Sequence, residues 1–169
     1  MTIARAASPV SLVAAVGIVA GSAFAVCSSP VAAARPVPDG LYRLSFAGTE
    51  PSDFDYSEPR GPYTWLLAIR SACPPSGCVA TATNVGGVST TYVFRQSGGR
   101  YISSQAQGFT CEGKKTAGIS TMSFTASDTT LTGELVESAS PCQPISRSFT
   151  ALREGDLPSG VTVADPNTV

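Results

Sequence analysis

The stretch Tyr63–Thr83, YTWLLAIRSACPPSGCVATAT, indicates the architecture of this chain most directly. Up to Cys73 its residues alternate between two faces in steps of two, which is the period of a β-strand. Two prolines, a serine and Gly77 then provide turn chemistry, because proline fixes φ and glycine accepts φ values that other residues avoid. The alternation resumes at Cys78. The stretch therefore predicts a β-hairpin that carries Trp65, the single tryptophan of the chain.

The hairpin also predicts a disulfide bond. Opposed residues on antiparallel strands have β-carbons close enough for a bridge, so Cys73 and Cys78 can pair if they face each other. Four cysteines lie beyond residue 34 and allow three pairings, and the hairpin leaves Cys111 and Cys142 for the second bridge. We expect both bridges to be structural, because the spacing differs from a redox C-x-x-C site. The expected register pairs Cys73 with Cys78, Ser71 with Ala80, and Ile69 with Ala82.

Short alternating runs separated by turn residues continue along the chain, and no window beyond the N-terminus has a helical period. We expect an all-β fold, an antiparallel meander of about eight strands that forms a barrel or near-closed barrel, with a two-sheet β-sandwich as the alternative. Gly133, between the inward Leu131 and Leu135, marks a bulge or a close contact. The expected strands are 41–47, 63–73, 78–83, 89–96, 101–107 with 109–111, 118–126, 131–136 and 145–153.

Residues 1–34 have the features of a secretory signal peptide with an apolar helix: a basic start, an uncharged apolar stretch and small residues before a cleavage site. Cleavage is expected after Ala25 or Ala34, and Ala34 is favoured because it leaves an even number of cysteines. The alternatives are an uncleaved membrane anchor and a lipoprotein attached through Cys27.

The expected organisation after the signal peptide is a single β domain, 35–155, followed by a flexible C-terminal tail, 156–169. We expect a secreted or cell-envelope protein without stable membrane insertion once the signal is removed.

Composition excludes several kinds of chemistry. The chain has no histidine, which removes the commonest general base and the commonest zinc ligand. Its net charge of −1 gives no reason to expect nucleic-acid binding. There is no G-x-S-x-G motif and no phosphate-binding glycine loop. We therefore expect no enzyme, no cofactor and no metal site. A carboxylate-only hydrolase is the remaining catalytic alternative, with candidate acids Asp53, Asp55, Glu58, Glu134 and Glu137.

Two groups of residues are candidates for binding. The loop 48–62 holds four acids within nine residues. Its D-x-D spacing does not match a calcium loop, because the sixth position is Glu58 and the twelfth is Thr64. Asp53, Asp55 and Glu58 are instead a candidate contact loop for a basic partner. The second group is a candidate pocket of aromatic side chains, which could equally form the core: Tyr63, Trp65, Tyr92, Phe94 and Tyr101.

Several motifs together resemble small exported mycobacterial (actinobacterial) proteins of unassigned function. These motifs are G-x-Y at 40–42, S-x-C at 71–73, G-C-V-A-x-A at 77–82, L-T-G at 131–133 and a C-terminal pair of cysteines. The resemblance implies a secreted or envelope-associated β-domain and carries over no functional residues. We expect a binding or interaction module whose partner is an unknown protein. The alternative is a carrier of a small hydrophobic ligand inside a barrel.

Overall fold

The structure is a computed structural model that describes residues 35–48, 61–87 and 89–169. The expected signal peptide, Cys27 and the candidate contact loop with Asp53, Asp55 and Glu58 lie outside these ranges. Within them, no helix has the length and apolar character needed to cross a bilayer.

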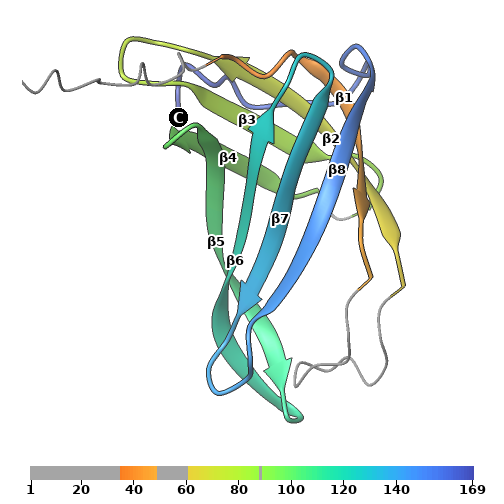
Figure 1. The fold of residues 1–169 in the computed structure, drawn as a ribbon, viewed down its shortest axis with the longest axis vertical. Helices are drawn as coiled ribbons and strands as arrows, with labels where there is room; N and C mark the ends of the chain where they lie inside the picture. Colours follow the sequence, from red (N-terminus) through yellow and green to blue (C-terminus); the bar gives the residue numbers. More distant parts are fainter. Residues whose placement is uncertain (1–34, 49–60, 88) are drawn as a thin grey trace, which may run out of the picture. The chain divides into compact units, whose positions relative to one another are not determined.

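The described residues form a closed antiparallel barrel in which every strand pairs with its neighbours in sequence and β1 pairs with β8 (Figure 1). The expected barrel is therefore confirmed, and the sandwich alternative is wrong. Closure leaves no strand at the edge of an open sheet. The strands are β1 (Gly40–Phe46), β2 (Tyr63–Ala72), β3 (Val79–Asn84), β4 (Thr91–Ser97), β5 (Arg100–Cys111), β6 (Lys114–Ala126), β7 (Thr130–Ser138) and β8 (Ile145–Gly155).

The β2–β3 hairpin has the expected register, with Ile69 opposite Ala82 and Ser71 opposite Ala80. Its ends are joined by the disulfide Cys73–Cys78. The second disulfide, Cys111–Cys142, ties the end of β5 to the connection between β7 and β8. Both bridges follow from the one register that the hairpin sequence favours.

The β5–β6 hairpin is longer than the sequence suggested. We expected two pieces before a turn at 112–115 and a strand from 118, but β5 is continuous and β6 begins at Lys114. The turn is only two residues, Glu112 and Gly113, and both have positive φ. Two successive positive φ angles define the tight turn whose twist matches antiparallel strands, so the ladder runs up to it on both sides.

Two ends of the barrel can be distinguished (Figure 1). Residues Arg35–Asp39, here called the strap, cross the end near Gly40, which we call the strap end. The β5–β6 hairpin reaches the opposite end, which we call the hairpin end.

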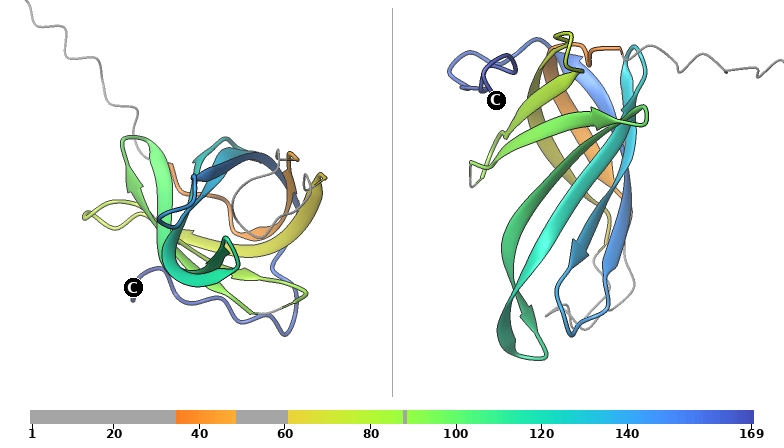
Figure 2. Two further views of the ribbon diagram at one scale, coloured as in Figure 1. Left: turned by 90° about the horizontal axis from the view of Figure 1, so that it is seen from below. Right: turned by 90° about the vertical axis from the view of Figure 1, so that its left-hand side faces the viewer.

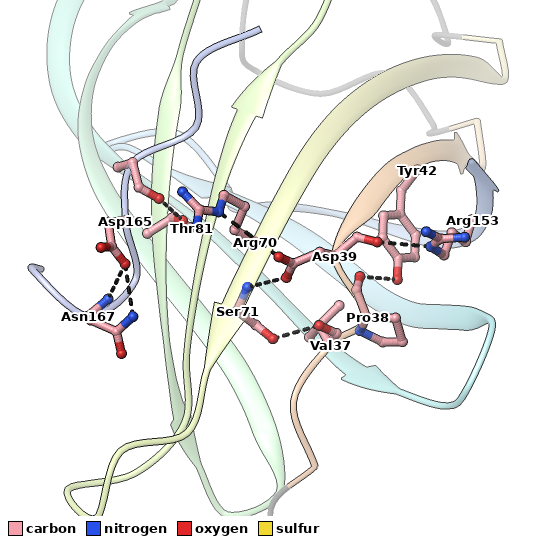
Figure 3. Close-up of polar contacts among 11 residues, drawn as sticks. Val37, Pro38, Asp39, Tyr42, Arg70, Ser71, Thr81, Arg153, Asp165 and Asn167 are labelled. Atoms are coloured by element: carbon pink, nitrogen blue, oxygen red, sulfur yellow. Dashed lines mark hydrogen bonds and ion pairs between the residues drawn. The ribbon is translucent and has the colours of Figure 1, made fainter. Parts of the chain in front are cut away.

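The strap is held by side chains from inside the barrel. Val37 is buried in the core cluster. The Tyr42 hydroxyl donates to the Pro38 carbonyl at 2.7 Å, and the Tyr101 hydroxyl donates to the Arg35 carbonyl at 2.8 Å. The Ser71 hydroxyl donates to the Val37 carbonyl at 2.5 Å (Figure 3). The hydroxyls that end two buried rings therefore find partners on the strap, as buried tyrosines require.

The strap-end interior is packed with rings. Phe94, Phe124 and Tyr101 contact in series, with ring centroids 4.9 Å and 5.3 Å apart. Further from the strap, at the other end of β1, Phe46 packs against Phe149 at 5.2 Å. These are ordinary separations for aromatic pairs in a close-packed core.

Gly133 makes the close contact expected of it. A Cβ built there would lie 2.1 Å from the Ser123 carbonyl oxygen and 2.8 Å from the ring of Phe149. A side chain is therefore excluded at this position by the neighbouring backbone, and the glycine lets a ring pack against the strand.

The C-terminal segment, residues 156–169, differs from the expected flexible tail. It forms no strand, but Val163 and Pro166 are buried. Two threonine side chains on β3 bond to its carbonyls, Thr81 to Ala164 and Thr83 to Thr162. The segment lies along the outside of the barrel (Figure 2, left). Packing against the outer face of β3 therefore orders a stretch whose composition suggests a loose end.

Candidate functional site

Inward positions change character along the strands that approach the hairpin end. On β7 the buried series runs Leu135 and Glu137 and continues at Ala139, just past the end of the strand. On β8 it runs Phe149, Arg147 and then Ile145. Strand alternation sends these residues to the same side of the sheet. The interior therefore has an apolar core, then a charged layer, then a second apolar cluster.

The second cluster is small and surrounds the Cys111–Cys142 disulfide, with Phe109, Ala139 and Ile145. It separates the charged layer from the tip of the hairpin. On the other side of that layer the large core cluster begins with residues such as Leu135 and Phe149.

The charged layer, together with the buried Ser103 on β5, is here called the polar tier: Ser103, Glu137 and Arg147. Arg147 donates a hydrogen bond from Nη1 to Glu137 Oε2 within an ion pair. Only 1% of the Arg147 side chain and 11% of the Glu137 side chain are exposed. The pair forms because of the register of the adjacent strands β7 and β8. Glu137 is opposite Ile145 and Leu135 is opposite Arg147, so Glu137 and Arg147 are diagonal neighbours on the inner face.

A buried ion pair is expensive. Removing two charges from water costs several kcal/mol each, and replacing such a pair by apolar residues of similar volume is often neutral or stabilising. The pair therefore contributes little that apolar residues would not supply to folding. What it does supply is a charged donor and a charged acceptor inside a barrel whose other described interior residues are mostly apolar.

Tyr92 on β4 faces the same region. Burial raises the pKa of its phenol, and the negative charge of Glu137 raises it further. The hydroxyl therefore stays protonated at neutral pH. Its ring packs beside Phe94 with centroids 5.9 Å apart, so it lies at the border between the core and the polar tier.

The barrel wall beside Tyr92 is weakly paired. β4 and β5 share only three residue pairs, between Arg95–Ser97 and Arg100–Ile102. Beyond these the strands diverge (Figure 2, right). The Gln105 side chain crosses this seam and donates to the Thr91 carbonyl at 2.6 Å. A side-chain bond at this position therefore replaces part of a backbone ladder.

The structure divides the five aromatic residues of the candidate pocket. Phe94 and Tyr101 are completely buried in the core, where neither is open to a ligand. Tyr63, Trp65 and Tyr92 are partly buried and pack against the edge of that core. Tyr63 and Trp65 belong to one aromatic group around Phe46, with centroids 4.7 Å and 4.8 Å from its ring.

The candidate acids of the hydrolase alternative are not brought together where they are described. Glu134 and Glu137 lie on opposite faces of β7, because three residues separate them on a strand of period two. Glu134 is exposed and accepts a hydrogen bond from Ser146 at 3.2 Å. Among the described residues, no three acids or cysteines are grouped in a way that could hold a metal ion.

Arg147 is the functional candidate that sequence reasoning missed. The signal was present, since Ile145, Phe149 and Ala151 predict an inward face and Arg147 shares their parity. An arginine at an inward position is the informative observation, because arginine is almost never fully buried unless it is paired.

The architecture described so far defines a class of protein, closed eight-stranded barrels with one packed end and one end that contains charge. A solved structure is similar to the chain in fold. It is the monomer form of the M. tuberculosis PknI sensor domain, with a TM-score of 0.63 and 23% identity, covering 80% of this chain and 99% of that one. At this identity the likeness shows the fold.

The family is shown by sequence. The family model of the PknI serine/threonine-protein kinase sensor domain matches residues 34–168, so the chain belongs to the PknI sensor domain family. No curated protein sequence matches it. The resemblance to exported mycobacterial proteins of unassigned function is thereby narrowed to a sensor-domain family.

Proposed function

We propose that this protein is an exported binding module of the sensor type, without catalytic activity, which recognises a small ligand at the polar tier. Membership of a kinase sensor-domain family supports the sensing role. The observation that carries the location of the site is the Arg147–Glu137 ion pair, buried inside the barrel beside Tyr92.

The ligand class follows from the surroundings. Arg147, Glu137 and the protonated Tyr92 offer charged and neutral hydrogen-bonding groups, while Tyr63 and Trp65 offer apolar ring surface at the edge of the core. Sites of this kind combine apolar walls with a few placed polar groups. We propose a small amphipathic ligand that reaches the tier where β4 and β5 diverge.

The proposed site differs from that of a carrier that holds a hydrophobic ligand in the centre of the barrel. The strap-end interior is filled by rings in mutual contact, including Phe94 and Tyr101. A ligand is therefore placed next to this core and contacts the three partly buried aromatic residues.

Secretion or attachment to the cell envelope is part of the proposal, through the signal peptide at 1–34 or an anchor at the same place. A contact between a basic protein partner and Asp53, Asp55 and Glu58 is a second proposed interaction. It is supported by the density of acids in that loop.

The test is a native intact mass of the protein isolated from an actinobacterial host that exports it. We expect an additional mass that is lost on denaturation. The double variant R147M/E137L replaces both charged side chains by apolar side chains of similar volume, so it should lose the additional mass. The matched control E134Q changes an exposed acid on the same strand and should keep it.

Two results would overturn the proposal. One is a wild-type protein with no additional mass whose melting temperature is unchanged by a small-molecule extract of the envelope. The other is an additional mass that R147M/E137L retains. The same spectra report whether residues 1–34 have been removed.

A further inference from the structure

The outer face of β3 is covered, whereas the outer face of β8 is open. Along β3 the inward Ala80 and Ala82 alternate with three outward residues, Val79, Thr81 and Thr83, yet all three outward residues are buried. The outward residues of β8 are instead exposed. The C-terminal segment, which lies along the outside of the barrel, accounts for this difference (Figure 2, left).

The contacts between β3 and the C-terminal segment have a regular spacing. Thr81 Oγ1 donates to the Ala164 carbonyl at 2.6 Å, and Thr83 Oγ1 donates to the Thr162 carbonyl at 3.0 Å. Two hydroxyls two residues apart on the strand thus meet two carbonyls two residues apart on the segment, in opposite order. The segment therefore runs antiparallel to β3 with the rise of an extended chain. Val163, between the two bonded carbonyls, is buried.

A charge lies at one end of this arrangement. Arg70 on β2 is positioned between Asp39 of the strap and Asp165 of the C-terminal segment (Figure 3). The pKa of Asp165 is lowered chiefly by its backbone and side-chain bonds with Asn167, and the charge of Arg70 lowers it further. The face therefore provides two hydroxyl donors, a position for an aliphatic side chain and a cation.

Sheet pairing does not contribute to this contact in the described part of the chain. The segment is not a strand, and its own backbone bonds are local, from Val161 N to the Pro158 carbonyl and from Thr168 N to the Asp165 carbonyl. A segment held by a few side-chain contacts opens at lower free energy than a strand in a ladder.

We propose that the outer face of β2 and β3 is a docking groove for an extended peptide, and that residues 162–165 occupy it in cis. The partner is an extended segment of another protein in which an aliphatic residue is followed two positions later by an aspartate. The aliphatic side chain takes the place of Val163 and the aspartate faces Arg70. This groove is on the outside of the barrel and is separate from the polar tier.

The experiment uses the full chain and a fluorescent peptide that spans residues 157–169. Wild-type protein should bind it weakly, because its own segment competes. V163G loosens that segment and should bind the peptide at least about tenfold more tightly, since apparent affinity follows the fraction of open groove. Adding T81V should weaken binding about fivefold, the loss expected for one hydrogen bond.

Two controls make the test specific. T132V removes an exposed threonine hydroxyl from the outer face of β7 and should leave peptide affinity in the V163G background unchanged. A peptide that itself carries glycine in place of Val163 should not bind. If V163G proves unstable, D165K, which places two cations together, opens the groove by repulsion and carries the same expectations.

The proposal is overturned if folded V163G and D165K proteins both fail to bind the peptide. It is also overturned if T81V and T132V have the same effect, since binding would then lie elsewhere. In either case the segment is a fixed structural part of the barrel.

Discussion

At the strap end, tyrosine hydroxyls inside the barrel bond to the chain that crosses it, and the interior behind them is aromatic. At the hairpin end, the interior contains an ion pair, and a disulfide rather than a packed strap holds the elements together. Each end has one disulfide, yet among the described residues the buried charges, Glu137 and Arg147, lie toward the hairpin end. The barrel interior is therefore filled by rings at one end and contains charged groups at the other.

The strongest test of this comparison is removal of one member of the buried pair. R147A leaves Glu137 buried without its partner and should destabilise the protein by on the order of 3–5 kcal/mol. R147M/E137L should be much less destabilised, because it removes both charges and keeps volume. Urea unfolding monitored by Trp65 fluorescence measures both.

The control for this prediction is R43A. Arg43 and Glu154 form an ion pair on the outside of the barrel, where solvent screens the charges, so stability should change little. If R147A were as mild as R43A, the buried pair would not distinguish the hairpin end.

The two disulfides provide a second comparison of the two ends. Cys111–Cys142 joins residues 31 apart and Cys73–Cys78 joins residues 5 apart. On the chain-entropy model their loss costs about 4 kcal/mol and about 2 kcal/mol, respectively. Calorimetry of C111A/C142A and C73A/C78A should therefore show the larger fall in melting temperature at the hairpin end. Equal falls would mean that loop length does not govern their effect.

Two glycines on the β5–β6 hairpin test how tightly the hairpin end is packed. A Cβ at Gly118 would lie 2.3 Å from the Ser138 carbonyl oxygen and 2.7 Å from the Phe109 ring, whereas a Cβ at Gly108 meets nothing within 4 Å. G118A should therefore cost about 1–3 kcal/mol. G108A should be neutral or slightly stabilising, because alanine loses less entropy than glycine in a strand. Matched thermal melts measure the pair, and similar melting temperatures would show that the hairpin shifts to accept a side chain.

Much of the barrel could be predicted from the sequence because alternation and turn residues are local signals. Ile69, Ser71 and Cys73 fixed the register of β2 and β3 through one pair of cysteines. The N-terminal limit of β6 could not be predicted, because residues 114–117 are polar or small and only the Glu112–Gly113 turn geometry continues the ladder through them.

The candidate site was less predictable. The parity of Arg147 was visible in the sequence, but its partner depends on the offset between β7 and β8, which local patterns do not contain. The place of the C-terminal segment depends likewise on Thr81 and Thr83, whose hydroxyls suit solvent as well as a carbonyl. Both arrangements depend on contacts that the local sequence pattern does not contain, a side-chain pair between two strands in one case and hydroxyl-to-carbonyl bonds in the other.

The smallest expected effect concerns the tyrosines of the two ends. Burial is the main cause that raises the pKa of Tyr42 and Tyr101 near the strap and of Tyr92 near the polar tier. A raised folded-state pKa means that the phenolate forms more easily in the unfolded chain. The associated stability is therefore fully present below the unfolded value of about 10 and is lost as pH rises above it.

This predicts a barrel whose unfolding free energy is flat with respect to these groups near neutral pH and falls above about pH 10. Absorbance titration at alkaline pH should show delayed phenol ionisation that coincides with unfolding. The charge of Glu137 helps to raise the pKa of Tyr92 but is not a cause of the raised pKa of Tyr101. E137Q should therefore bring the ionisation of Tyr92 closer to that of Tyr101 and leave Tyr101 unchanged. Y92F removes the Tyr92 phenol and so identifies its part of the absorbance change. If E137Q shifted neither tyrosine, the charge of the polar tier would not reach Tyr92, and the border between the packed end and the charged end would lie nearer to β7.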